Sequence, residues 1–166
     1  MVELRFKKLT ETAQIPRLAT ENAACFDLVV DRIEEVAPGK IKLFFGLACE
    51  FPDDYKLCIV PRSSFNHKDW VMQNSPGQVD PDYRGEIAMY LQAFPVGVEV
   101  THNIFADTSE GELVYPDSPY QVGDRAAQAF LQAIVPTRIL EVGEVSVTKR
   151  GTGGFGSTGV GELAIN

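Results

Sequence analysis

The amino-acid sequence predicts an all-β fold. Short segments rich in β-branched and aromatic residues recur along the chain, and clusters of Pro, Gly, Asp and Asn separate them. Alternation within residues 85–94 places four apolar side chains on one face of a strand: Ile87, Met89, Leu91 and Ala93. Many short strands at this spacing are typical of a sandwich, jelly roll or barrel and not of an α/β fold.

Eight segments carry the strand pattern in order along the chain: 3–9, 24–30, 40–48, 55–60, 85–94, 98–105, 126–135 and 144–148. Turn-forming residues lie between several of them, at 38–39, 52–54 and 117–119. Residues 63–70 alone indicate a helix, of one or two turns, with a hydroxyl side chain available as its N-cap. The pattern therefore predicts a single β-rich domain with one short helix.

Length and composition are those of an ordinary globular domain. The 166 residues are 45% hydrophobic, and the mean hydropathy is -0.06, which is enough to bury one core. No apolar run approaches the length of a membrane span, and the N-terminus lacks a signal-peptide pattern. Cys25, Cys49 and Cys58 lack paired spacing, so we expect no disulfide framework and no zinc site, but reduced thiols in the cytoplasm.

The net charge of -8 argues against long nucleic acid as a partner, because too few cations are available to neutralise a row of phosphates. A small phosphorylated ligand that carries its own divalent cation is compatible with an acidic protein. His67 and His102 have no companion at metal-ligand spacing, and neither accompanies a nucleophile motif. The charge balance favours a small ligand.

A glycine-rich stretch at 150–159 has the composition of a phosphate-binding flap. Glycines let backbone N–H groups approach an anion, Ser157 and Thr158 add hydroxyl donors, and Arg150 adds a forked cation. Phe155 is free to stack on a flat ligand. The G-x-G-x-x-G pattern within the stretch fails because too little chain follows for a helix and a second strand. The Walker A pattern fails because Ser157 occupies the position of the phosphate-binding lysine. The alternative is a disordered glycine tail.

Two further stretches carry polar groups beside apolar strands. Asp27 is an acid within an apolar strand, where it either forms hydrogen bonds or contacts a cation, or caps a turn at the strand edge. Arg62, Ser63 and Ser64 precede the short helix, where backbone N–H groups, hydroxyls and a guanidinium could bind an anion. The alternative for this motif is an ordinary helix cap with a surface arginine.

Residues 74–86 are the densest in residues suited to chemistry. Gly77 would let a ligand approach the backbone, Tyr83 offers a flat face, and either Asp80 or Asp82 could act as a general base. Asn74 could pair with a nucleobase edge or satisfy a turn. The stretch also suits a hairpin turn, and both interpretations can hold together.

A fifth stretch, at 123–128, leads into the last long apolar strand. Gln128 could reach a ligand from it. Asp124 and Arg125 are interpreted as a structural ion pair or a turn.

Read together and in this order, the five stretches at 24–28, 61–64, 77–85, 123–128 and 150–159 resemble the five motifs of the trimeric dUTPase family. The third and fifth are specific, and the resemblance spans residues 23–159. It implies a β-rich jelly roll (β-clip) with a C-terminal arm, here 1–149 and 150–166. It also implies a homotrimer with shared active sites, in which the arm crosses to a neighbour.

The reaction implied by the resemblance is hydrolysis of dUTP to dUMP and pyrophosphate, with Mg²⁺ on the triphosphate. This reaction keeps uracil out of DNA and supplies dUMP for dTMP synthesis. Asp80 would activate the attacking water, and Asp27 would act on Mg²⁺ through water. Arg62, Ser63 and Ser64 would hold the phosphate chain.

The remaining roles implied by the resemblance concern the base, the sugar and the arm. Tyr83 would pack against deoxyribose, while Asn74 and the backbone near Gly77 would read uracil. Gln128 would approach the phosphates. Phe155 would stack over uracil, and a set of arm residues would clamp the β- and γ-phosphates: Arg150, Gly156, Ser157 and Thr158.

The sequence departs from the family pattern at several points. Cys25 and Ser64 stand where glycine is usual, and Ala126 replaces a larger aliphatic residue. Much of 95–119 resembles an insert, for which a longer surface hairpin is the favoured interpretation and a site for a regulatory protein is the other. Two rival functions stay open: a dCTP deaminase-related enzyme, and a nucleotide-gated binding protein that uses the insert.

Overall fold

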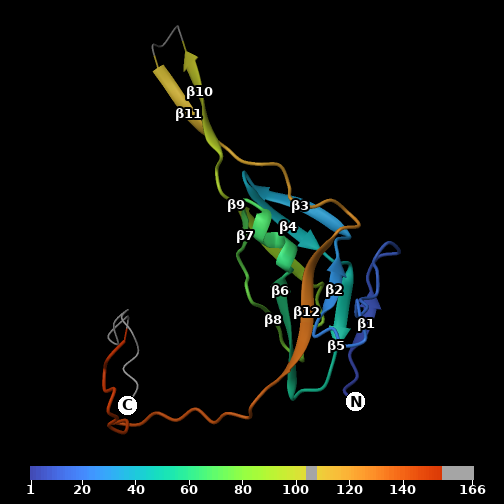
Figure 1. Ribbon diagram of the computed structural model, residues 1–166, viewed down its shortest axis with the longest axis vertical. Coiled ribbons are helices and arrows are strands. Elements are labelled where there is room, and N and C mark those ends of the chain that lie inside the picture. The colour runs from blue at the N-terminus through green and yellow to red at the C-terminus, as the bar shows by residue number, and fades with distance from the viewer. Residues whose placement is uncertain (104–107, 155–166) are drawn as a thin grey trace. The chain divides into compact units, whose positions relative to one another are not determined.

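The structure is a computed structural model that describes residues 1–103 and 108–154. Its described part is built from strands and a single 3₁₀-helix (Figure 1). In chain order these are β1 Arg5–Lys8, β2 Phe26–Val29, β3 Arg32–Ala37, β4 Lys40–Phe44, β5 Leu47–Glu50, β6 Tyr55–Pro61, η1 Ser63–His67, β7 Trp70–Met72, β8 Gly77–Val79, β9 Ala88–Ala93, β10 Gly97–Asn103, β11 Thr108–Val114 and β12 Arg125–Ala133. The all-β prediction is confirmed.

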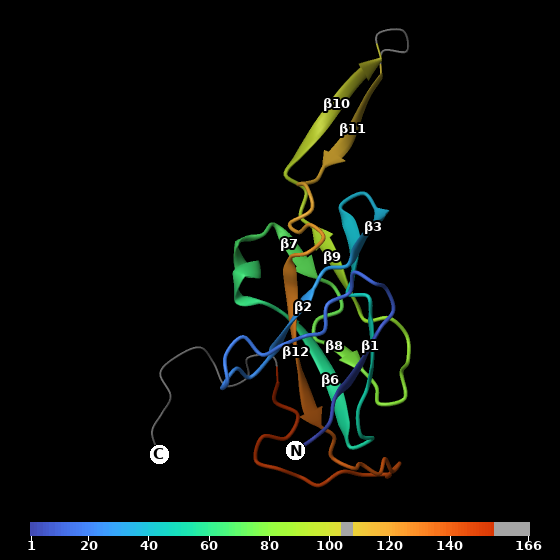
Figure 2. The same cartoon turned by 90° about the vertical axis from the view of Figure 1, so that its right-hand side faces the viewer.

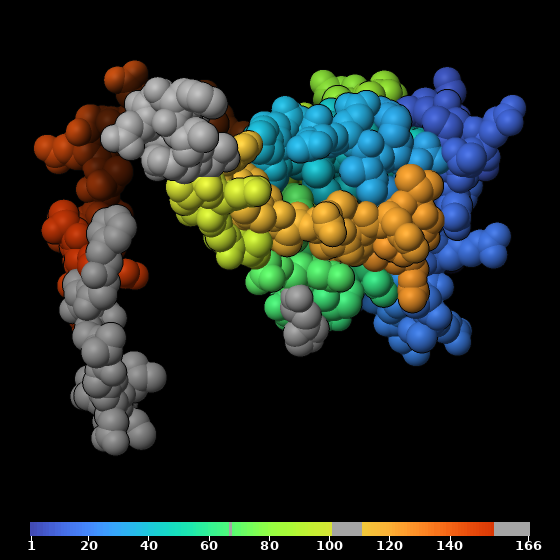
Figure 3. Space-filling model, turned by 90° about the horizontal axis from the view of Figure 1, so that it is seen from above, coloured from blue at the N-terminus to red at the C-terminus, as the bar shows by residue number. Residues whose placement is uncertain are grey.

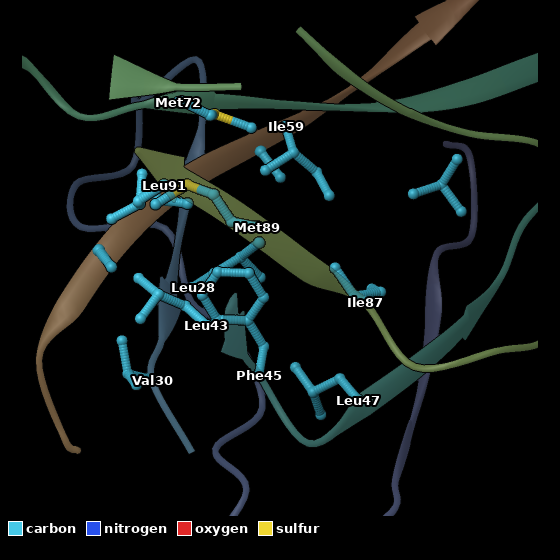
Figure 4. Packing of buried hydrophobic residues seen from close by; sticks show 14 of the residues in the cluster. Leu28, Val30, Leu43, Phe45, Leu47, Ile59, Met72, Ile87, Met89 and Leu91 are labelled. Carbon is cyan, nitrogen blue, oxygen red and sulfur yellow. The ribbon is translucent and has the colours of Figure 1, made fainter. Parts of the chain in front are cut away.

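Two four-stranded antiparallel sheets form the body of the fold, in the orders β2-β12-β6-β8 and β3-β4-β9-β7. Both sheets contribute inward-facing side chains to one buried cluster, among them Leu28 and Ile59 from the first sheet and Leu43 and Met89 from the second (Figure 4). Burial of this shared apolar surface is the main stabilising contribution to the fold. The arrangement is that of a two-layer jelly roll.

The alternation predicted for 85–94 is confirmed. Ile87, Met89, Leu91 and Ala93 are all buried, and β9 lies between β4 and β7 in its sheet. These side chains therefore belong to the buried cluster, while the intervening residues face outward. That outward face matters for the site described below.

Several strand boundaries differ from those predicted. The segment 40–48 is divided into β4 and β5, because Gly46 adopts a positive φ of 63° and lies against Ala13 and Asp31. Short strands β3, β7 and β8 and the second hairpin strand β11 were not predicted, since each is too short or too polar to show a period of two. The prediction of a strand at 144–148 is wrong: the structure gives these residues no strand.

The short helix is present, as a 3₁₀-helix instead of an α-helix. Its N-cap is Arg62, which makes no side-chain capping hydrogen bond, so the predicted hydroxyl cap is wrong. Packing holds this helix in place instead. The ring of Phe65 stacks on Tyr120 at a centroid distance of 6.1 Å and an interplanar angle of 9°.

Residues of the resemblance-based insert form the antiparallel hairpin β10–β11, which appears as a separate two-stranded ribbon in Figure 2. This is the favoured surface-hairpin interpretation. The chain then returns beside the β3–β4 hairpin, as the orange and light-blue atoms of Figure 3 show. There the ring of Tyr115 leaves no room for a Cβ at Gly39, whose φ is 67°. The turn predicted at 38–39 thus requires glycine.

The chain divides into two compact units, Met1–Val135 and Pro136–Asn166. The first contains every strand of the described residues and the buried cluster. The described part of the second contains no helix or strand and ends in turns at 149–152. No helix in the described residues is long and apolar enough to cross a membrane.

The three cysteines are free thiols, and Cys49 and Cys58 are buried. Burial raises the pKa of the Cys49 thiol to about 11, although the nearby Arg84 guanidinium opposes the shift. At neutral pH this thiol is therefore protonated and behaves as a small core residue.

Candidate active site

One pocket of about 220 Å³ gathers predicted residues of the third motif and of the segment just before it. Four of them line it together: Asn74, Gly77, Asp80 and Tyr83. They come from the β7–β8 connection, from β8 and from the turn that follows it, so a single stretch of chain supplies one wall. The opposite wall is the outward face of β9 and β4. A concave site with a few convergent polar groups is what a small ligand requires.

Gly77 brings the backbone close to this pocket. A Cβ at this position would lie 3.2 Å from Ile59 Cβ and 3.3 Å from the Asn74 carbonyl oxygen. A side chain at residue 77 would therefore crowd Ile59, its partner in the β6–β8 pair. The predicted approach of a ligand to this backbone stays a prediction, and the observed close contacts are with Ile59 and Asn74.

The amide of Asn74 is engaged with the backbone of β9. Its Oδ1 accepts a hydrogen bond from the Tyr90 N–H at 2.9 Å, and its Nδ2 donates to the Ala88 carbonyl at 3.4 Å. These bonds tie the start of the site-bearing stretch to the neighbouring strand. Of the two interpretations of Asn74, this structure displays the one in which its amide satisfies local backbone groups.

The structure distinguishes the two carboxylates of the third motif. Both side chains are exposed, but only Asp80 is among the residues that line the pocket. The turn that carries them is closed by a hydrogen bond from the Tyr83 N–H to the Asp80 carbonyl at 3.1 Å. Asp80 is therefore the carboxylate positioned to meet a ligand in this pocket.

Tyr83 and Glu86 fix the end of the same turn. The Tyr83 hydroxyl donates to the Glu86 carbonyl at 3.2 Å, and its ring lies against Gly85. The Glu86 carboxylate accepts the Gly46 N–H at 3.0 Å and faces Arg32 at 3.5 Å. The C-terminal end of the turn is thereby attached to Gly46 and to Arg32 of β3.

A second group of charged residues joins the first, second and fourth motifs. One carboxylate oxygen of Asp27 accepts a hydrogen bond from Arg62 Nε at 2.8 Å, and the other accepts one from Arg125 Nη1 at 3.0 Å. Arg62 also donates to the Arg125 carbonyl at 3.2 Å. The sheet order β2-β12-β6 brings the three together, and the Asp27 side chain is only 17% exposed. Asp27 is thus linked to cations, one of the two interpretations offered for it.

The remaining residues of these motifs surround this charged group. Gln128 donates to the Pro61 carbonyl at 3.2 Å and lies opposite Asp27 across the β2–β12 pair. Ser63 and Ser64 are exposed at the start of η1. Asp124 accepts the Gln121 N–H at 2.9 Å, which makes 121–124 a turn, while Arg125 pairs with Asp27 and not with Asp124.

The predicted arm lies only partly within the described residues. Arg150 donates through Nε to the Gly153 carbonyl at 2.8 Å, and the Gly151 N–H contacts the Thr148 carbonyl at 3.1 Å. Four of the predicted arm residues lie outside the described residues: Phe155, Gly156, Ser157 and Thr158.

No group of three or more His, Cys, Asp or Glu side chains that could hold a metal ion occurs in the described part of the chain. Asp27, the predicted water-mediated metal contact, has a guanidinium on each oxygen. Because two guanidiniums already contact its carboxylate, Asp27 is poorly suited to bind a cation directly.

The family model for dUTPase matches residues 11–102, more than half of the chain. A deoxyuridine 5'-triphosphate nucleotidohydrolase of Nautilia profundicola is 40% identical over 163 residues, which covers 95% of this chain and 99% of the relative. The chain belongs to the dUTPase family.

Solved dUTPases share the fold. The Staphylococcus bacteriophage 80alpha dUTPase with dUPNHPP matches with a TM-score of 0.74 and 24% identity over 95% of this chain and 99% of that one. A mutant dUTPase from phage phi11 of S. aureus, in which a structural Mg(II) ion is coordinated, matches with a TM-score of 0.64 and 19% identity over 87% and 99% of the two chains. These likenesses confirm the jelly-roll prediction.

Sequence reasoning missed several residues of this dUTPase pocket. Lys42 and Tyr90 line it, and the two are cross-strand partners in the β4–β9 pair. The alternation of β9 already placed residue 90 on the outward face, but its partner depends on a register that one sequence does not reveal. Likewise, the pairing of Arg125 with Asp27 depends on contacts between strands that are distant in sequence.

Replacing Asp27 with Asn should lower the free energy of unfolding by about 1–3 kcal/mol. An amide retains one acceptor oxygen but directs an NH₂ group at the second guanidinium, which leaves that cation unpaired. Urea unfolding midpoints measure the change. The matched control is Glu34→Gln, which breaks the exposed pair with Arg32 and should change stability by less than about 0.5 kcal/mol. Equal effects of the two substitutions would contradict a structural role for the Asp27 cluster.

Proposed function

We propose that this dUTPase hydrolyses dUTP to dUMP and pyrophosphate by attack of water on the α-phosphorus. The observation that carries the proposal is the pocket that gathers Asn74, Gly77, Asp80 and Tyr83. It combines a close backbone approach, an aromatic face and a carboxylate that can accept a proton. These are the groups needed to hold a nucleoside and to activate a water beside its phosphate.

In this proposal Asp80 accepts the proton of the attacking water as the new oxygen–phosphorus bond forms. Tyr83, held by its bond to the Glu86 carbonyl, packs against deoxyribose. The backbone at Gly77 and the Asn74 side chain read uracil, and Asn74 exchanges a bond to β9 for one to the base. Proton transfer by a positioned group of this kind contributes roughly 10²- to 10⁴-fold to the rate.

The charged group around Asp27 orients the phosphate-binding residues. Asp27 holds Arg62 and Arg125 in fixed directions beside Ser63 and Ser64. Arg62, the two serines and Gln128 contact the phosphate chain, and pre-oriented donors of this kind stabilise charge that develops on a leaving oxygen. When bound on the triphosphate, Mg²⁺ would neutralise phosphate charge, and Asp27 would act on it through water.

The active form is a homotrimer with shared sites, and the segment after β12 supports this part of the proposal. Its apolar side chains are unusually exposed for a folded chain: Ile139 at 91%, Val145 at 84% and Val147 at 98%. Alternation at 145 and 147 is the pattern of a strand, so a neighbouring subunit would supply the missing cover. The arm 150–166 would then close over a neighbour's pocket, with Phe155 on uracil and its other polar groups on the phosphates.

Turnover of a nucleotide panel with Mg²⁺ tests the function directly. We expect pyrophosphate release from dUTP, with kcat/KM for dCTP, dTTP and UTP lower by at least roughly 100-fold, as a site built to hydrogen-bond one ligand provides. Ammonia release from dCTP would instead support the deaminase-related alternative. Tight dUTP binding without turnover would support the binding-protein alternative.

A further inference from the structure

Lys42 projects from β4 into the wall of the candidate nucleotide pocket. It lines this pocket together with Asn74, Gly77 and Tyr90. The register of the two central strands places it directly opposite Tyr90 on the outward face of the sheet. None of the five sequence motifs contains it.

Two aromatic rings hold the Lys42 ammonium in place. Its Nζ lies 4.4 Å from the centroid of Phe44 and 5.1 Å from that of Tyr90. Cation–π contacts orient an ammonium without using up its N–H donors. Among the described residues the structure assigns Lys42 neither a hydrogen bond nor an ion pair, so all three donors are available to a ligand.

The position of Lys42 along the pocket indicates which part of a nucleotide it would meet. Asp80 and Tyr83, which the proposed function places at the α-phosphate and the sugar, lie on the turn after β8. Lys42 lies opposite Tyr90 in the strand pair, and the Tyr90 N–H donates a hydrogen bond to Asn74. In the proposed function, Asn74 contacts uracil. A uracil seated in this order points the carbonyl at its position 4 away from the sugar and toward the Asn74 end.

We propose that Lys42 donates a hydrogen bond to the carbonyl oxygen at position 4 of uracil and so favours uracil over cytosine. This inference rests on the proposed function. At that position uracil presents an acceptor, whereas cytosine presents an amino group that donates. The Lys42 ammonium can therefore donate a hydrogen bond to uracil. With cytosine it would face an amino group, so two donors would meet and neither would be satisfied.

Steady-state kinetics of Lys42→Met tests the proposal, since methionine keeps the packing on Phe44 and Tyr90 but has no donor. We expect the KM for dUTP to rise roughly tenfold, the loss of about one hydrogen bond to a charged group. The kcat for dUTP and the kcat/KM for dCTP should stay the same, so the preference for uracil falls by that factor.

Lys40→Met is the matched control. Lys40 also contacts the Tyr90 ring, with its Nζ 5.8 Å from the centroid, but it is not among the residues that line the pocket. Its substitution should leave kcat and KM unchanged for both dUTP and dCTP. Both variants should have the melting temperature of the wild type, which would show that neither kinetic result comes from unfolding.

Binding of deoxyuridine, followed by NMR titration, separates a base contact from a phosphate contact. A base contact predicts the same roughly tenfold loss for this nucleoside, which carries no phosphate. An unchanged affinity for deoxyuridine, an unchanged KM, or equal losses for dUTP and dCTP would each overturn the proposal. Wild-type protein that fails to hydrolyse dUTP would instead refute the proposed function itself.

Discussion

Asp80→Asn should lower the rate of pyrophosphate release at least roughly 100-fold while dUTP binding stays within about threefold of wild type. Asp80 is the carboxylate that lines the candidate pocket, and an amide cannot accept the proton of an attacking water. Loss of a general base lowers kcat by roughly 10²- to 10⁴-fold. Because asparagine has the same shape, the turn closed by the Asp80 carbonyl is unaffected. Single-turnover kinetics and calorimetry with a non-hydrolysable dUTP analogue measure the two quantities separately.

Asp82→Asn is the matched control for this prediction. Asp82 lies two residues away on the same turn, is exposed and is not among the residues that line the pocket. Removal of its charge should leave kcat within about twofold of wild type. If both substitutions lowered kcat equally, general electrostatics would explain the loss better than proton transfer by Asp80. Near-normal turnover by Asp80→Asn would rule out the proposed role.

The fold was predictable where periodicity was strong. The pattern at 85–94 correctly placed Ile87 and Met89 in the core, because a half-buried strand shows its buried face at every second residue. The wrong prediction at 144–148 has the same origin. Val145 and Val147 show the period of a strand, yet a strand also needs a partner, and sequence alone does not say whether the same chain supplies one.

The candidate site was predictable where its residues are close in sequence. Asn74, Gly77, Asp80 and Tyr83 belong to one turn and its flanks, so local composition identified them together. Contacts across the sheet were not predictable in the same way. That Asp27 binds two arginines, and that Lys42 faces the pocket, both follow from strand order and register.

Truncation after Lys149 should lower kcat/KM for dUTP by roughly 10²-fold or more while the fold and the assembly persist. The compact unit Met1–Val135 contains the whole buried cluster, so loss of residues 150–166 removes no core packing. The proposed arm contributes Arg150, Phe155 and hydroxyl donors to the bound nucleotide. Donors that meet charge in a water-excluded site are each worth roughly 10²- to 10³-fold.

Kinetics and sedimentation velocity distinguish the arm as a lid from the arm as a structural element. A second truncation, after Gly159, keeps every predicted arm residue and should retain nearly full activity. The additional loss of activity in the truncation after Lys149 would then come from residues 150–159. The exposed apolar residues Ile139 and Val147 precede both cuts, so a trimer that depends on covering them should survive in both variants. A monomeric or unfolded product after Lys149 would show instead that the arm stabilises the assembly. Full activity without the arm would show that Asp80 and its pocket complete the reaction without a lid.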